Sequence, residues 1–169
     1  IIRRLCNMYD LMIIGSGPAG ISAALTAKAR NLNFIWFGSR ALSTKIEKAE
    51  KIMNYPGLPA VTGSEMQSVF LKQIDDCDIT ITEAQVNSIY DCGGYFAAGA
   101  DNEIYEAKSV IMTVGMTTTR EIEGEARLLG CGVSYCATCD GALYKNKDIA
   151  VICASPKFED EVTFLAGLA

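Results

Sequence analysis

The feature that most constrains the fold is a glycine-rich turn, "GSGPAG" at residues 15–20, which separates a short apolar run from an alanine-rich segment. The apolar run is "YDLMII" at 9–14, and the segment "AGISAALTAKARN" has the composition of a helix that ends near Asn31. A second apolar run, "LNFIWFG", follows at 32–38. A strand, a helix and a strand in this order predict a parallel β-α-β unit, and therefore an α/β fold.

The next eighty residues predict a helix and then several short strands. Residues 39–59 are polar and basic, with turn residues in "NYPGLP", and predict a loop with one helical turn. The segment "SEMQSVFLKQIDD" predicts a helix with Ser64 as its N-cap. One face of this helix would carry Met66, Val69, Phe70 and Ile74.

Three alternating runs, at 78–90, 94–108 and 109–115, follow this helix. Glycines and an Asp-Asn pair separate them, which predicts antiparallel hairpins followed by a return strand. The fold expected for this part is Rossmann-like, with three layers: a parallel sheet, its helices and an antiparallel β-meander.

The composition changes after Gly115, where "MTTTREIEGE" is polar and predicts a linker. Beyond it we expect a loop with two cysteines, a strand at 148–153 ("DIAVIC") and an amphipathic helix at 156–169. One strand and one helix cannot cover each other's apolar faces, so this second domain is expected to be unfinished and the chain to be a fragment. We predict domains at 1–116 and 117–169, with 1–7 as a leader.

Composition excludes several classes of function. The net charge of −5 and the pI near 4.8 provide no positive field for the phosphates of nucleic acid. The longest apolar stretch contains three glycines and a proline, so it is a poor membrane span, and no signal-peptide cleavage pattern is present. Seven cysteines are an odd number, unlike a secreted disulfide framework, and we expect a cytoplasmic protein. The absence of histidine excludes Ser-His and Cys-His catalysis.

The glycine turn predicts dinucleotide binding, because Gly15, Gly17 and Gly20 form G-x-G-x-x-G between a strand and a helix. The first glycine would allow the tight turn, the second the approach of a pyrophosphate, and the third close packing of helix on strand. The alternative is a tight turn without a ligand. The second strand ends at Gly38 and Ser39 without the acid that usually binds the ribose of NAD, which leaves FAD plausible.

The sequence "CATCDG" places Cys136 and Cys139 close enough for a disulfide across one turn. A helix beginning there would favour the thiolate of Cys136, and Asp140 could give a proton to a departing thiolate. Three alternatives remain: a surface turn with an incidental acid, a zinc site, and an iron–sulfur site. A zinc site needs four ligands, and the sequence contains no histidine and no second C-x-x-C to complete one. An iron–sulfur cluster would use Cys131 and Cys153 as well.

Several motifs in a fixed order resemble the low-molecular-weight thioredoxin reductase family. They are "GSGPAG", "NYPG", the Thr-Val-Gly that ends the first part, and "GCGVSYCATCDGALYKNKDIAVI". The resemblance covers nearly the whole chain. It implies an FAD-binding domain, of which 1–116 would be the N-terminal part, and a second nucleotide-binding domain that begins at 117 and carries the cysteine pair.

The resemblance also implies residue roles. Cys136 and Cys139 would be the redox pair, with Asp140 as the acid, and electrons would pass through FAD and this pair to thioredoxin. The full-length protein would be a homodimer. The expected FAD-binding residues are Gly15, Ser16, Gly17, Pro18, Ala19, Gly20, Gly38, Ser39, Asn54, Val86 and Gly115, and no metal is expected.

One departure from the family concerns the electron donor. Members that use NADPH have a second glycine fingerprint after the strand that corresponds to "IAVI". Here those positions hold Cys153, Ala154, Ser155 and Phe158, whose side chains would crowd the turn and the helix–strand contact. The chain has lost this second fingerprint while keeping the cysteine pair, and its 37–57 loop lacks the Gly-Gly-Gln of the NADPH enzymes. In both respects it resembles the ferredoxin-dependent flavin thioredoxin reductases. The alternatives are an NADPH-dependent enzyme and a truncated, non-catalytic flavin-binding fragment.

Overall fold

The computed structural model describes residues 8–115 and 122–169, which fall into two compact units. The first unit contains residues up to 44 and 67–119, and the second contains 45–66 and 120–169. The predicted leader and most of the predicted linker lie outside the described residues.

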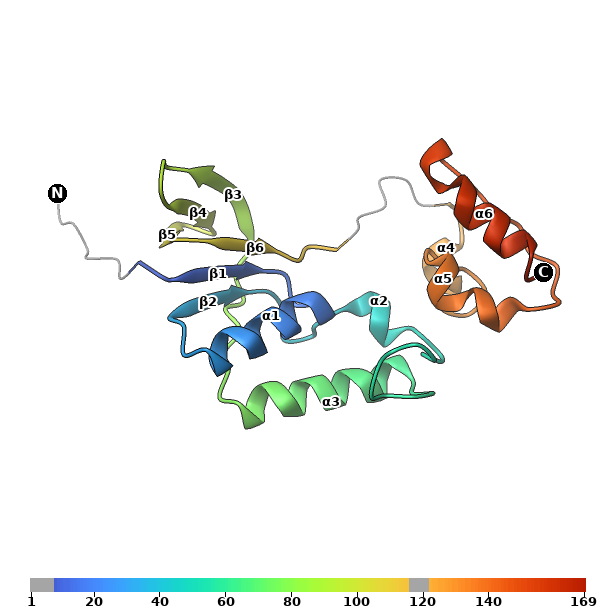
Figure 1. Cartoon of the computed structure of the whole chain (residues 1–169), viewed down its shortest axis with the longest axis horizontal. Coiled ribbons are helices and arrows are strands. Elements are labelled where there is room, and N and C mark those ends of the chain that lie inside the picture. Colours follow the sequence, from blue (N-terminus) through green and yellow to red (C-terminus); the bar gives the residue numbers. More distant parts are fainter. Residues whose placement is uncertain (1–7, 116–121) are drawn as a thin grey trace. The chain divides into compact units, whose positions relative to one another are not determined.

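The first unit contains a three-stranded parallel sheet (Figure 1). Its chain runs through β1 (Leu11–Ile14), α1 (Pro18–Ala29) and β2 (Phe34–Phe37) before β6 (Val110–Met112) returns much later. The strand order is β2-β1-β6, with Met12 aligned to Ile35 on one side and to Val110 on the other. The predicted β-α-β unit and the predicted return strand are therefore confirmed.

A second sheet of the same unit is an antiparallel meander. It consists of β3 (Val86–Asp91), β4 (Phe96–Ala100) and β5 (Glu103–Ala107) in that order. The β4–β5 turn is tight, with Asp101 in the left-handed region at φ 51°, a conformation that aspartate tolerates better than most residues. The hairpins predicted from the alternating runs are confirmed.

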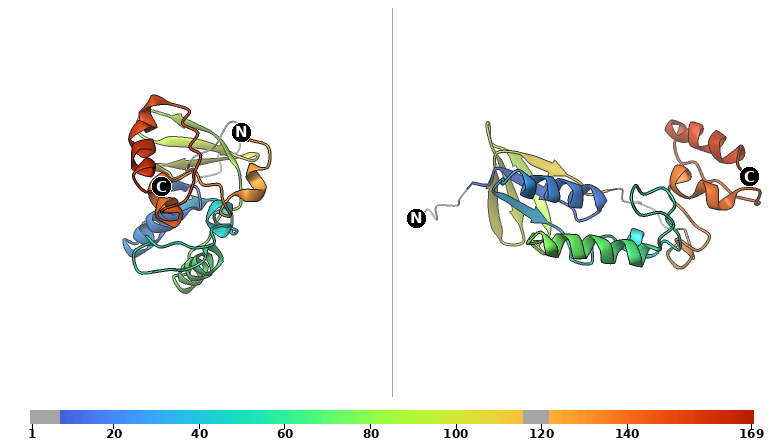
Figure 2. Two further views of the ribbon diagram at one scale, coloured as in Figure 1. Left: turned by 90° about the vertical axis from the view of Figure 1, so that its right-hand side faces the viewer. Right: turned by 60° about the horizontal axis from the view of Figure 1, so that its bottom comes forward.

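The core of this unit lies between the two sheets and under the helices. Met12 and Ile14 of β1 pack with Phe37 of β2 against Ala98 and Ala107 of the meander. The alanines are small, which lets the two sheets approach closely. Alternation along a strand sends the next residues to the opposite face. On that face α1 and α3 lie together (Figure 2), which completes the three predicted layers.

The helix α3 (Gly63–Asp76) begins with a reciprocal cap. Thr62 Oγ1 accepts the Glu65 N–H at 3.2 Å, and the Glu65 carboxylate accepts the Thr62 N–H at 2.8 Å. The N-cap is therefore Thr62, and the prediction of Ser64 is wrong. Of the four residues predicted to share one face, Met66, Phe70 and Ile74 are buried, whereas Val69 is 44% exposed. The loop before α3 contains the predicted single turn of helix, α2 (Thr44–Glu47).

The C-terminal part of the second unit, residues 122–169, is built from short helices. They are α4 (Glu125–Leu128), α5 (Ala137–Asp140), the 3-10 turns η1 (Gly141–Tyr144) and η2 (Pro156–Phe158), and α6 (Glu159–Ala166). The predicted C-terminal helix is confirmed. The predicted strand at 148–153 is wrong: these residues belong to no helix or strand, and Ile152 is 76% exposed. A strand needs a neighbour for its ladder of hydrogen bonds, and this unit has none at that position.

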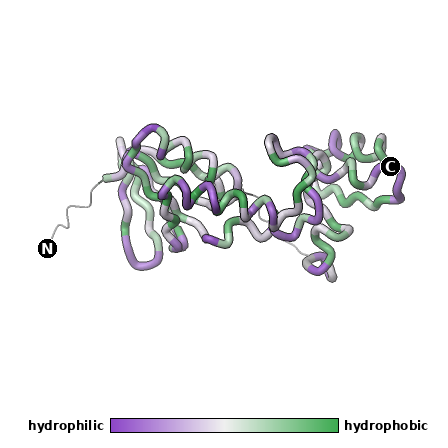
Figure 3. Tube along the Cα trace, turned by 90° about the horizontal axis from the view of Figure 1, so that it is seen from below, coloured by the Kyte–Doolittle hydropathy of each residue, from purple (hydrophilic) through white to green (hydrophobic). Residues whose placement is uncertain are grey.

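Hydrophobic residues occur along both units (Figure 3). Phe158 and Phe164 are 48% and 44% exposed in the second unit, whereas Trp36 and Phe37 are each 1% exposed in the first. None of the helices in the described ranges has the length and apolar character needed to cross a bilayer.

Candidate functional site

Three loops of the first unit follow the carboxyl ends of parallel strands. The glycine loop at 15–17 follows β1, Gly38 follows β2, and residues 113–115 follow β6. Because the three strands are parallel, these loops meet at one edge of the sheet. Such an edge is where open α/β sheets bind their ligands.

Gly15 is held tightly between the two neighbouring strands. Its N–H donates to Phe37 O at 2.8 Å, and its carbonyl accepts from the Trp36 indole N–H at 2.9 Å and from Thr113 Oγ1 at 3.0 Å. Its φ is +113°, and a Cβ added there would lie 2.3 Å from Thr113 O. Both the backbone angle and the space therefore require glycine at this position.

The other two glycines of the fingerprint lie in opposite surroundings. A Cβ on Gly20 would lie 1.9 Å from Gly15 O, so close packing of α1 on the loop depends on its absence. A Cβ on Gly17 would meet no atom within 4 Å. Gly17 is the N-cap of α1, with no side-chain cap bond and no acidic residue in the first turn. The positive end of this helix is therefore not neutralised by its own side chains.

Ser16 joins the glycine loop to the loop after β2. Its hydroxyl accepts the Ser39 N–H at 2.9 Å and donates to Leu42 O at 3.2 Å, and the residue is 7% exposed. A buried hydroxyl that uses both donor and acceptor fixes the distance between two loops. The structure thus brings together the predicted residues of 15–20 with Gly38 and Ser39.

The remaining predicted cofactor residues have fewer contacts with the loops at the carboxyl ends of the parallel strands. Gly38 donates to Thr82 O at 3.2 Å, which brings the segment before β3 alongside β2, and Val86 lies half-buried at the start of β3. Gly115 is exposed, with φ +69°. Asn54 is exposed in the second unit. Their contacts with a cofactor remain predictions.

Two supporting residues were not predicted from the sequence. Trp36 contributes the indole hydrogen bond to Gly15, and the Thr113 hydroxyl donates to Ile14 O at 2.9 Å as well as to Gly15 O. Thr113 lies 99 residues from Ile14, so only knowledge of the strand order could have placed it there. The lone tryptophan at the end of an apolar run was the one available signal for Trp36.

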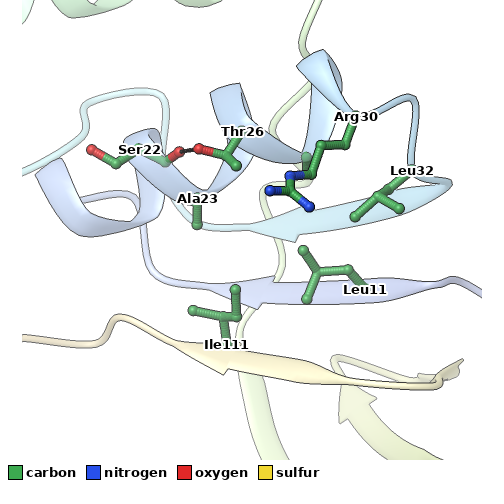
Figure 4. A pocket seen from close by; sticks show the side chains of 8 residues that line it. Leu11, Ser22, Ala23, Thr26, Arg30, Leu32 and Ile111 are labelled. Carbon is green, nitrogen blue, oxygen red and sulfur yellow. Dashed lines mark hydrogen bonds between the residues drawn. The ribbon is translucent and has the colours of Figure 1, made fainter.

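A shallow recess of about 340 Å³ lies elsewhere on the same unit (Figure 4). It is lined by Leu11, Ser22, Ala23, Thr26, Ala27, Arg30, Leu32 and Ile111. None of the predicted site residues is among them, and its walls are mainly aliphatic. This recess is therefore separate from the glycine loop.

The second unit contains the predicted cysteine pair as a disulfide. Cys136 is bonded to Cys139, with their Cα atoms 5.2 Å apart. Cys136 is the N-cap of α5, and its sulfur accepts the Cys139 N–H at 3.2 Å. A backbone N–H directed at this sulfur would stabilise a thiolate there once the disulfide is opened. Cys139 itself is exposed to solvent and accessible to another thiol.

Asp140 ends the short helix that begins after Cys136. Its carboxylate accepts a hydrogen bond from Ser134 Oγ at 2.5 Å, and the same oxygen of Ser134 accepts the Cys136 N–H at 3.1 Å. The predicted acid therefore lies in the loop of the disulfide, held by a serine that was not predicted from the sequence.

Cys131 lies in the same unit with a different partner. Its thiol donates to the Glu50 carboxylate at 3.1 Å, and this hydrogen bond, with burial and the negative charge, raises the pKa of Cys131. Burial raises the pKa of Tyr144, and the charges of Asp140, Glu50 and Cys131 add to the effect. The Cys153 thiol donates to Ser155 O at 3.1 Å.

The four cysteines of the iron–sulfur alternative are therefore engaged in other ways. Two form the disulfide and two donate to oxygen atoms. Within residues 8–115 and 122–169, no group of three or more acidic or cysteine side chains is arranged to hold a metal ion.

The turn where a second glycine fingerprint would stand carries side chains. Ser155 caps η2, with its hydroxyl accepting the Lys157 N–H at 3.4 Å. Phe158 was expected to crowd a helix–strand contact, but it is 48% exposed because the strand at 148–153 is not formed.

The first unit and the disulfide define a class: a chain with a dinucleotide-type β-α-β unit and a C-x-x-C disulfide. This chain belongs to the pyridine nucleotide-disulphide oxidoreductase family, whose model matches residues 9–156. Curated relatives include thioredoxin reductases of Ureaplasma parvum, 34% identical over 164 residues, and Bacillus subtilis, 29% identical over 164 residues. These matches cover 96% of this chain and 53% and 52% of the relatives. The chain thus spans about half their length.

Solved structures show the same likeness. A ferredoxin-flavin thioredoxin reductase from Clostridium acetobutylicum is 44% identical, with a TM-score of 0.66 over 96% of this chain and 56% of that one. A thioredoxin reductase from Streptococcus pyogenes is 32% identical, with a TM-score of 0.80 over 96% of this chain and 54% of that one. The resemblance to thioredoxin reductases, including the ferredoxin-flavin subgroup, is confirmed, as is the Rossmann-like α/β fold.

Proposed function

We propose that this chain is part of an FAD-dependent dithiol–disulfide oxidoreductase of the thioredoxin reductase type. Electrons would pass from a donor by way of FAD to the Cys136–Cys139 pair and then to thioredoxin. The observation that carries the proposal is the disulfide at the start of α5, with Asp140 in the same loop. Dividing the chain into an FAD domain at 1–116 and the beginning of a second domain at 117 is part of this proposal.

The glycine loop is suited to FAD. The first turn of α1 has no side-chain cap and no acidic residue, and the space beside Gly17 is open, so a pyrophosphate could approach its backbone N–H groups. Ser16 and Ser39, joined by a hydrogen bond, would hold the loop near the ribose. The chemistry that FAD supplies when bound is the transfer of two electrons between a donor and a disulfide.

The disulfide would react by exchange. When it is reduced, two electrons and two protons convert Cys136 and Cys139 into thiols. A thiolate of the pair then attacks the thioredoxin disulfide, which forms a mixed disulfide and displaces one thioredoxin sulfur. The second cysteine of the pair attacks the first, which re-forms the Cys136–Cys139 disulfide and releases thioredoxin as a dithiol. The Cys139 N–H would stabilise negative charge on Cys136, and Asp140 would give a proton to a departing thiolate.

Ferredoxin is the donor that we propose. The 153–158 turn lacks the glycines that admit a pyrophosphate, and Ser155 and Pro156 form a capped turn there instead. The 44% identity to a ferredoxin-flavin thioredoxin reductase supports the same choice. NADPH is the alternative donor, and the thioredoxin reductases among the relatives keep it open.

The proposal has two further parts. We expect a homodimer for the full-length protein and a cytoplasmic location. The free thiols Cys77, Cys92, Cys131 and Cys153 support a reducing compartment.

The test uses the complete gene product, purified without oxygen. Reduced ferredoxin should bleach the visible flavin band within seconds, whereas NADPH should leave it unchanged. Thioredoxin should then be reduced at a rate that falls at least about 100-fold in Cys139→Ser, since one cysteine cannot complete the exchange. In this variant the bleaching by ferredoxin should persist.

Other outcomes decide against parts of the proposal. Bleaching by NADPH and not by ferredoxin would assign the donor to NADPH. A protein that purifies without flavin, or that binds flavin but reduces no thioredoxin, would be a non-catalytic member of the family.

A further inference from the structure

One hydroxyl connects the proposed acid to the redox loop. Ser134 Oγ donates to the Asp140 carboxylate at 2.5 Å and accepts the N–H of Cys136 at 3.1 Å. The Asp140 N–H in turn donates to Cys136 O at 3.1 Å. The serine, the first cysteine and the acid thus form a closed hydrogen-bonded ring.

In the disulfide state the acid is bonded to this serine and not to sulfur. Within the described residues, Ser134 Oγ is the hydrogen-bond partner of the Asp140 side chain. Asp140 is half-buried, and Ser134 is exposed at the surface of the same loop. An aspartate at the end of a four-residue helix would otherwise rotate freely about its χ angles, so this contact determines where its carboxylate points.

We propose that Ser134 is a positioning residue for disulfide exchange at Cys136–Cys139, because it orients the Asp140 carboxyl group. The inference rests on the proposed role of Asp140 as the acid. In the exchange, an incoming thiolate forms a bond to one sulfur and the other sulfur leaves with the electron pair of the broken S–S bond. The leaving sulfur takes the proton of the Asp140 carboxyl group, which solvent later restores.

Ser134 also contributes after the proton has moved. Its hydroxyl donates to the carboxylate that is left, and hydrogen bonds to charged groups are stronger than neutral ones. The same oxygen holds the Cys136 N–H, so the acid and the disulfide keep one fixed arrangement through the step.

The experiment follows reduction of the disulfide by dithiothreitol in the whole chain, which requires neither flavin nor thioredoxin. Ser134→Ala should slow the reaction about tenfold, a part of the effect expected of a general acid. Ser134→Thr keeps the hydroxyl and should restore the rate to within about threefold.

Asp140→Asn tests the same contact from the other partner. The double variant Ser134→Ala/Asp140→Asn should be no slower than Asp140→Asn alone, because the serine acts through the acid. Ser155→Ala removes another hydroxyl of this unit that accepts a backbone N–H, on a half-buried residue, and should leave the rate unchanged.

Three outcomes would overturn the inference. They are a wild-type rate in Ser134→Ala, additive losses in the double variant, and a wild-type rate in Asp140→Asn. A wild-type rate in Asp140→Asn would also remove the acid role proposed for Asp140. None of the three touches the proposed electron path through FAD and the cysteine pair, which flavin bleaching and thioredoxin reduction measure separately.

Discussion

The two units of this chain differ in how their apolar residues are covered. In the first unit all four residues of β1 are buried, and two sheets and two helices enclose them. In the second unit the run at 149–153 has the same apolar character, yet Val151 and Ile152 are 41% and 76% exposed. An apolar strand sequence thus becomes a strand only where neighbouring strands supply hydrogen bonds and packing.

The contrast extends to the two candidate sites. The glycine loop is fixed by hydrogen bonds to residues that are far apart in the sequence, such as those of Gly15 with the Phe37 carbonyl and the Thr113 hydroxyl. The disulfide loop is fixed by contacts within seven residues, from Ser134 to Asp140. Substitutions that disturb the core of the first unit should therefore also disturb the glycine loop. The geometry of the disulfide loop should be less sensitive to substitutions outside residues 134–140.

The largest expected effect concerns the core of the first unit. Trp36→Ala should lower the free energy of unfolding by about 3–5 kcal/mol, because the side chain is 1% exposed and its indole holds the Gly15 carbonyl. Ile152→Ala, in the second unit, should change it by no more than about 0.5 kcal/mol. Urea unfolding followed by circular dichroism measures both. A loss above about 2 kcal/mol in Ile152→Ala would show that the 149–153 run is packed in solution.

The next effect separates stability from cofactor binding within one loop. Gly20→Ala should cost about 1–3 kcal/mol, since its Cβ would lie 1.9 Å from the Gly15 carbonyl oxygen. Gly17→Ala meets open space and should cost less than about 1 kcal/mol, but it should weaken FAD binding by narrowing the approach to the helix. Urea unfolding and FAD titration would be run on both variants. Equal stability losses would contradict the packing described for these two glycines.

A smaller effect tests the electrostatics of the second unit. The Glu50 carboxylate raises the pKa of Cys131, so at pH 8 this thiol should carry less thiolate than an ordinary cysteine. Glu50→Ala lowers that pKa and should speed alkylation of Cys131 by iodoacetamide at pH 8. The rates should converge at higher pH, where the thiol is ionised in both proteins.

Mass spectrometry of the alkylated peptides gives the rate at each cysteine. Cys153, which donates to the Ser155 carbonyl, is the internal control and should react at the same rate in both proteins. Slower alkylation of Cys131 in Glu50→Ala would contradict the assignment.

The smallest effect concerns a surface ion pair of the first unit. Arg40 Nη2 lies 2.7 Å and 2.8 Å from the two carboxylate oxygens of Asp75, but both side chains are about half exposed. Arg40→Ala should therefore cost no more than about 1 kcal/mol, less in high salt. The fluorescence of Trp36 during urea unfolding reports on this unit. A loss as large as that of Trp36→Ala would mean that the loop after β2 depends on this pair.

Much of the first unit could be predicted from the sequence, because its signals are local. The glycine fingerprint and the apolar runs on either side of its helix predicted β1, α1 and β2. The alternation of apolar and polar residues predicted the antiparallel meander. Thr62 was missed because Thr62 and Ser64, two residues apart, are both residue types favoured at an N-cap, and only the hydrogen bonds distinguish them. Thr113 was missed because its partner lies at the other end of the unit.

The second unit was predicted less well for a physical reason. The "CATCDG" motif led to the disulfide and to Asp140, but Ser134 is one serine among several in the chain and acts only through the fold of its loop. The prediction of a strand at 148–153 was wrong because periodicity and composition show that a segment is suited to a sheet. They do not show whether a neighbouring strand is present to pair with it.

The late return of β6 has a consequence for synthesis of the chain. β1 pairs with β6 at Met12 and Val110, so its second edge is completed only after about 100 further residues have been added. At about 5–20 residues per second, this apolar strand waits for roughly 5–20 s with one edge open. Such an edge can pair with a strand of another chain. Crowded polysomes should therefore be the setting in which this protein is most prone to aggregate, before β6 has paired with β1.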